Sequence, residues 1–149
     1  MARYQCNTCG AVAEQEQTAA ECCPHCASRN VVNLALQAAE TAKANDAFRT
    51  QAPLGGHPVY QGRVVATRGV SAEGPEFVTR ALLETAAFKD FTEDNDPYGD
   101  HSMGAVQVCG KAVWWKIDLY DADYRYGADD PLDDKNTRRV LTLHFPSEY

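Results

Sequence analysis

Basic residues are scarce in this chain of 149 residues. It carries 14 lysines and arginines against 21 aspartates and glutamates, which gives a formal net charge of −7. The first 30 residues hold only Arg3 and Arg29 against three glutamates. Because proteins bind nucleic acids largely by neutralising phosphates with lysine and arginine, this composition disfavours direct binding to DNA or RNA.

Long apolar runs are also missing, and no stretch reaches the length that a bilayer-spanning helix needs. We expect no secretory signal in the residues before Cys6. Five of the six cysteines fall within the first 26 residues and Cys109 is alone, which does not suit a secreted disulfide scaffold. We therefore expect a soluble, cytoplasmic protein that makes no membrane contact.

Two short cysteine pairs are the most specific chemical signal in the chain. Cys6 and Cys9 form one C-x-x-C pair, and Cys23 and Cys26 form another. Two such pairs supply four thiolates at the spacing of a tetrahedral zinc site. The pattern resembles a rubredoxin-like zinc ribbon, so we expect Zn²⁺ bound within residues 1–33, with iron as the alternative metal.

Two neighbouring residues compete with this ligand set. Using Cys22 in place of Cys23 would turn the second pair into C-x-x-x-C. His25 lies between Cys23 and Cys26, which already bind the ion in the predicted site. We therefore keep the four cysteines of the two C-x-x-C pairs as ligands. Four protein ligands leave no open position for water, so the predicted zinc is structural.

The remainder of the chain, residues 34–149, predicts one α+β domain. A ribbon of about 30 residues buries too little surface to fold without its metal, whereas the rest of the chain can form its own core. The patterns predict helices and strands at the following positions: helices over 34–51 and 75–88, and strands over 59–70, 105–109, 112–120 and 139–145. This order favours a mainly antiparallel sheet of about four strands, covered by helices on one face.

Acidic residues are concentrated between positions 90 and 134. This stretch contains twelve aspartates and glutamates and only three basic residues, so its net charge is −9. The candidate binding residues within this stretch are Asp94, Asp96, Tyr98, Asp100, His101, Asp129, Asp130, Asp133 and Asp134.

The segment 94–101 is the best single candidate for a site, because three aspartates and a histidine within eight residues suit a hard divalent cation. A calcium-binding EF-hand loop is excluded, since Ala105 stands where the bidentate glutamate belongs. Aspartate, asparagine, proline and glycine are also the residues that tight turns use. Turn structure is the favoured interpretation, and a binding surface or a metal centre are the alternatives.

A series of short motifs runs through residues 48–149. They are Thr67-Arg68-Gly69-Val70, Phe91-Thr92, the segment 94–101, Trp115-Lys116-Ile117-Asp118, Tyr120-Asp121, Arg139-Val140-Leu141-Thr142 and Glu148-Tyr149. Through these motifs the segment resembles a bacterial family of unknown function associated with plasmids and phage-derived regions. The resemblance implies a common fold and transfers no catalytic residue.

These observations predict a non-enzymatic zinc-binding protein that docks onto a protein partner through an acidic surface. An acidic stretch repels DNA and attracts basic grooves, such as those of nucleic-acid-processing proteins. The mobile-element association makes a host-defence inhibitor, of anti-restriction or anti-CRISPR type, one concrete version. The alternatives are a metal-dependent hydrolase or nuclease that uses Asp96, Asp100 and His101, and a zinc-ribbon regulator that binds nucleic acid.

We expect the purified protein to contain one zinc ion per chain. Replacing Cys9 or Cys23 by serine removes a thiolate ligand and should release the metal, whereas Cys22→Ser should retain it. Elemental analysis of the three variants tests this assignment. Loss of zinc from the Cys22 variant with retention in the other two would show that the wrong sulfurs were chosen.

Overall fold

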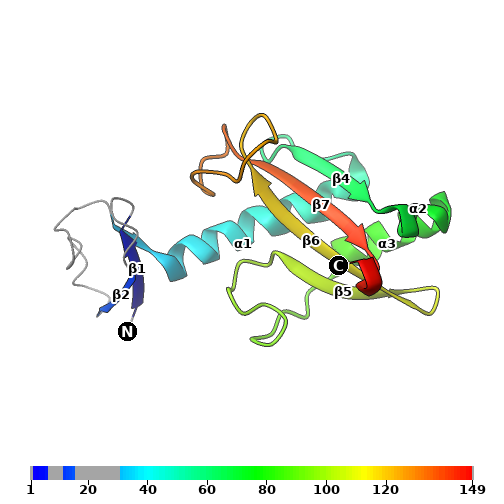
Figure 1. Ribbon diagram of the computed structural model, residues 1–149, viewed down its shortest axis with the longest axis horizontal. Helices are drawn as coiled ribbons and strands as arrows, with labels where there is room; N and C mark the ends of the chain where they lie inside the picture. The colour runs from blue at the N-terminus through cyan, green and yellow to red at the C-terminus, as the bar shows by residue number, and fades with distance from the viewer. Residues whose placement is uncertain (1, 7–11, 16–30, 149) are drawn as a thin grey trace. The chain divides into compact units, whose positions relative to one another are not determined.

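The computed structural model describes residues 2–6, 12–15 and 31–148 (Figure 1). The chain divides into two compact units, residues 1–40 and 41–149. Of the predicted zinc ligands, Cys6 is described. Cys9, Cys23 and Cys26 lie outside the described residues, as do the competing Cys22 and His25.

The first unit contains a small antiparallel sheet. Its strands are β1 (Ala2–Cys6), β2 (Val12–Gln15) and β3 (Val31–Asn33), and β1 pairs with both of the others. Cys6 ends β1 opposite Val31 and is 2% exposed. Helix α1 (Leu34–Gln51) follows β3 directly and has the bounds that the sequence predicts.

The second unit contains a four-stranded mixed sheet. Its strand order is β4 (Gly62–Ala66), β7 (Arg138–His144), β6 (Lys111–Tyr120) and β5 (Met103–Val108). The β4–β7 pair is parallel and the other two pairs are antiparallel. The predicted α+β class is therefore confirmed for this part of the chain.

The turn between β5 and β6 explains why these two strands form a hairpin. Cys109 and Gly110 connect them and have φ angles of 51° and 79°. Positive φ at both central residues is the geometry of a type I′ turn, whose twist matches that of paired strands.

Helices cover one face of this sheet. They are residues 41–51 of α1, helix α2 (Arg68–Ala72) and helix α3 (Pro75–Ala87); Figure 1 shows α1 and α3 behind the sheet and α2 beyond the end of β4. A 3-10 turn, η1 (Ala52–Leu54), follows α1. The core joins helical side chains such as Phe48 and Phe77 to Trp115, Leu141 and Leu143 of the sheet. Each such side chain contributes on the order of 2 kcal/mol by leaving water.

The predicted strand over 59–70 is wrong at both ends. Strand β4 covers only Gly62–Ala66, and the chain turns into α2 after Thr67. The Thr67 hydroxyl accepts a hydrogen bond from the Val70 amide at 3.5 Å, as a helix N-cap does. Val70 is fully buried, so this apolar residue packs into the core from a helix.

Glu148 connects the C-terminal segment, including the 3-10 turn η2 (Pro146–Glu148), to the start of α2. Its carboxylate accepts hydrogen bonds from the Phe145 amide at 2.9 Å, the Thr67 hydroxyl at 2.7 Å and the Gly69 amide at 3.1 Å. These bonds, led by the one from Phe145, lower the pKa of Glu148. A Cβ atom at Gly69 would lie 2.7 Å from Glu148 Oε2, so a larger residue there would require this carboxylate to shift.

The Glu148 contacts predict a pH-dependent contribution to stability. Because folding lowers the pKa of Glu148, its carboxylate stabilises the fold above the ordinary value of 4.5, and this stabilisation is lost as the pH falls through the lowered pKa. Glu148→Gln should therefore lower Tm at neutral pH, and its difference from the wild type should shrink as the pH falls below 4.5.

Thermal unfolding between about pH 3 and about pH 8 measures this difference. The exposed Glu76, in the first turn of α3, provides a matched Glu→Gln control. A Tm difference for the Glu148 variant that stays constant across this range would contradict the assignment.

Candidate functional site

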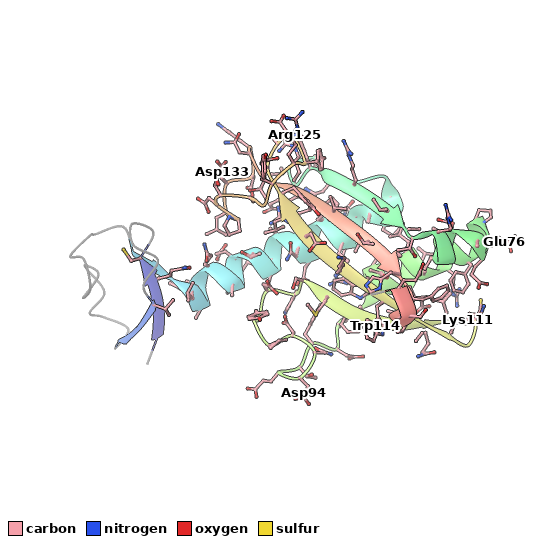
Figure 2. The ribbon with its side chains drawn as sticks, in the orientation of Figure 1. Glu76, Asp94, Lys111, Trp114, Arg125 and Asp133 are labelled. Atoms are coloured by element: carbon pink, nitrogen blue, oxygen red, sulfur yellow. The ribbon has the colours of Figure 1, made fainter. Side chains whose placement is uncertain are left out.

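The acidic stretch divides into two loops of the second unit. Loop 88–102 precedes β5, and loop 121–137 joins β6 to β7. Figure 2 places Asp94 of the first loop and Asp133 of the second on opposite sides of the sheet. The acidic residues that the sequence groups together therefore belong to two separate surfaces.

Aspartates of loop 121–137 bind backbone groups of the loop itself. Asp130 Oδ1 accepts a hydrogen bond from the Leu132 amide at 2.9 Å, and Asp133 Oδ1 accepts one from the Lys135 amide at 3.2 Å. Asp133 Oδ2 accepts a further bond from Asn136 Nδ2 at 2.8 Å, which is the main cause of the lowered pKa of Asp133. Asp129 and Asp134 lie in the same loop.

Loop 88–102 is held by its own polar side chains as well. Asn95 Oδ1 accepts a bond from the Thr92 amide at 2.8 Å, and Asp96 Oδ1 accepts one from the His101 amide at 3.1 Å. Asp96 is 9% exposed, whereas Tyr98 is 74% exposed. Asp96 thus stabilises the loop, and Tyr98 extends into solvent.

His101 connects this loop to helix α1. Its Nδ1 lies 2.9 Å from Asp46 Oδ2, and its Nε2 lies 3.6 Å from Asp96 Oδ2. The imidazole stacks on Phe91 with ring centroids 3.8 Å apart and an interplanar angle of 1°. Sequence reasoning missed Asp46, because no local pattern indicates that a helix far along the chain contacts His101.

Arg49, also on α1, is 2% exposed and binds the end of α3. Its Nη1 donates to the carbonyl oxygens of Thr85, Ala86 and Phe88 at 2.6, 3.2 and 3.0 Å. Its Nη2 donates to Asp46 Oδ1 at 2.9 Å. A cation is favourable here because the last carbonyls of a helix carry partial negative charge.

The Arg49 guanidinium also lies against aromatic rings. It is 5.1 Å from the ring centroid of Trp115 and 5.5 Å from that of Phe91. Trp115 in turn covers Gly104 of β5, where a Cβ atom would lie 2.7 Å from the indole Nε1. The contacts of Arg49 therefore extend from α1 and α3 to loop 88–102 and, through Trp115, to β6.

Asn45 adds a second connection from α1. Its side-chain Nδ2 donates to the Asp100 carbonyl oxygen at 2.9 Å, and its Oδ1 accepts from Arg139 Nε at 2.9 Å. Arg139 is fully buried, and burial lowers the pKa of its guanidinium. Loop 88–102 is thus held at both Asp100 and His101 by neighbouring residues of one helix.

The predicted combination of Asp96, Asp100 and His101 does not form a metal cluster in this geometry. Among the described residues, no three histidine, cysteine, aspartate or glutamate side chains converge as metal ligands. Both ring nitrogens of His101 face carboxylates, so neither is directed at a nucleophilic hydroxyl or thiol. The arrangement is suited to fixing the loop in place.

A groove of about 660 Å³ opens beside this loop. Its lining includes Asp90, Asp94, Met103, Trp114, Lys116 and Asp118. Trp114 is 38% exposed and Met103 41% exposed. Lys116 Nζ lies 3.3 Å from Asp118 Oδ2, so these two charges offset each other and the acidity of the groove comes from Asp90 and Asp94.

A second hollow, of about 400 Å³, lies along β5 and is lined by Glu84, Phe88, Lys89, Asp90, Ala105 and Gln107. The two hollows share Phe88, Asp90 and Ala105. Together they follow the edge of the sheet from loop 88–102 toward the β5–β6 turn.

The comparisons with known proteins give one match. A family model described as a protein of unknown function (DUF3768) matches residues 66–148, which is more than half of the chain. No curated protein and no solved structure matches the chain. No helix within the described residues is long and apolar enough to cross a membrane.

Proposed function

We propose a non-enzymatic docking function for this chain, which belongs to the family described as a protein of unknown function (DUF3768). The observation that carries the proposal is the groove of about 660 Å³ in which exposed Trp114 and Met103 lie beside acidic side chains. Tryptophan and methionine are enriched where proteins contact one another, and an aromatic anchor in a hollow is typical of a binding hot spot.

The charge of the groove favours a basic partner. Asp90 and Asp94 are exposed on its rim, and the chain as a whole carries a net charge of −7. Such a surface attracts basic proteins at a distance and repels nucleic acids. A nucleic-acid-processing protein has the required basic surface, so a host-defence inhibitor of anti-restriction or anti-CRISPR type is the concrete version that we propose.

We also propose that Cys6, Cys9, Cys23 and Cys26 bind a structural zinc ion. The proposal is supported by the C-x-x-C spacing, by the small antiparallel sheet of β1, β2 and β3, and by the burial of Cys6 where β1 ends. Bound zinc would supply folding free energy to a segment too short to build its own core.

The docking proposal predicts that charge reversal in the groove weakens partner binding. The test variant carries Asp90→Lys and Asp94→Lys, and a second variant carries Trp114→Ala. The control carries Glu76→Lys and Asp123→Lys, which make the same charge change at exposed positions of α3 and of loop 121–137. Tagged wild type captures the partner from the native cell, and the affinity of the purified pair is then measured for each variant.

We expect both groove variants to lower the affinity by about tenfold or more, and the control to change it by about twofold or less. Raised salt should weaken the wild-type complex, because it screens the attraction between exposed charges. Equal losses in the groove variants and the control would contradict a groove-specific interface. A hydrolytic activity abolished by His101→Ala would instead favour the metal-dependent hydrolase.

A further inference from the structure

We infer that the partner adds an extended segment to the free edge of β5, as an additional strand of the sheet. This inference rests on the proposed docking function and specifies how the partner binds. It starts from the order of the sheet, in which β5 pairs with β6 on one side and forms an edge on the other.

The register shows which backbone groups of β5 face this edge. The Ile117 amide donates to the Ser102 carbonyl oxygen at 2.7 Å, so Gly104 and Val106 exchange hydrogen bonds with β6. The intervening residues therefore direct their N–H and C=O groups away from β6; they are Met103, Ala105 and Gln107. No backbone hydrogen bond within the described part of the chain satisfies these outward groups.

Strand β5 carries no charged side chain and no proline, two of the devices that usually prevent strand addition. Proteins protect sheet edges with charged side chains, prolines or bulges. Met103, Ala105 and Gln107 are exposed, uncharged and compatible with strand pairing. The opposite edge strand β4 differs, because it carries Arg63, whose guanidinium lies 3.9 Å from the ring centroid of Tyr124.

The surroundings of the β5 edge indicate the chemistry of the added segment. An extended strand directs alternate side chains to the two faces of the sheet. On one face a bound segment would meet Trp114 and Asp94, and along the edge it would meet Glu84 and Asp90. These three acidic side chains outnumber the one basic side chain there, Lys89. The surroundings therefore favour a segment in which basic residues alternate with apolar ones.

A defined peptide tests this inference on the intact protein. The probe alternates arginine with valine, and two matched peptides replace arginine by glutamate or carry N-methyl groups on the backbone nitrogens of one edge. NMR of the labelled protein reports the site through the amide signals of Met103, Ala105 and Gln107. We expect the arginine peptide to shift these amides most, and N-methylation or the glutamate peptide to weaken binding by about tenfold or more.

A substitution in the protein, in place of a change in the peptide, tests the same edge. Ala105→Pro removes one outward N–H, and proline is tolerated on edge strands where the N–H faces away from the neighbouring strand. We expect this variant to bind the arginine peptide about tenfold more weakly. Thermal unfolding confirms its fold, and the N-methylated peptide keeps the test valid if the variant does not fold.

Three results would overturn the inference. If the N-methylated peptide bound equally well, strand addition to the β5 edge would be ruled out, and docking in the groove would still stand. No shift of the β5 amides by the arginine peptide at millimolar concentration would reject an alternating basic segment. A concentration-dependent dimer that Ala105→Pro abolishes would identify a second copy of the chain as the occupant. Failure of the proposed function itself is measured separately, by partner binding in the groove variants.

Discussion

The buried guanidinium of Arg49 is the interaction on which the arrangement around the groove depends. A cation this deeply buried costs several kcal/mol unless its donors are satisfied and its charge is balanced. Here the carbonyl oxygens at the end of α3 and the carboxylate of Asp46 accept hydrogen bonds from the two Nη atoms, and the ring centroids of Trp115 and Phe91 lie 5.1 and 5.5 Å from the guanidinium carbon. The buried Nε has no hydrogen-bond partner within the described part of the chain. One side chain therefore holds together the end of α3, the start of loop 88–102 and Trp115 of the sheet.

The shape of the groove depends on this arrangement. Asp46 binds both Arg49 and His101, and His101 stacks on Phe91, so the loop that carries Asp94 is tied to α1 at its C-terminal end. A polar surface loop without such contacts would be mobile and would offer no fixed acidic wall. The same loop leads directly into β5, so the acidic wall and the free strand edge are parts of one structure.

The sequence predicted the elements whose signals are local. The helix over 34–51, the helix that begins at Pro75 and the β5–β6 hairpin follow from helix formers, proline and glycine positions and strand alternation. Helix α2 was missed because its cap depends on Thr67 and on the distant Glu148. Asp46 and Arg49 were missed for a related reason, since charged residues on a helix suggest a solvated face unless long-range contacts bury them. The four zinc ligands stay a prediction from spacing alone.

Hydrogen exchange in an Asp46→Ala protein tests the central claim most directly. If Asp46 holds loop 88–102 through His101, the amides of Asp96, Gly99 and His101, which bond within the loop, should exchange about tenfold faster or more. The Leu141 amide, in the centre of the sheet, should exchange at its wild-type rate, and Asp129→Ala should leave both regions unchanged. Unchanged loop exchange in the Asp46→Ala protein would contradict the account.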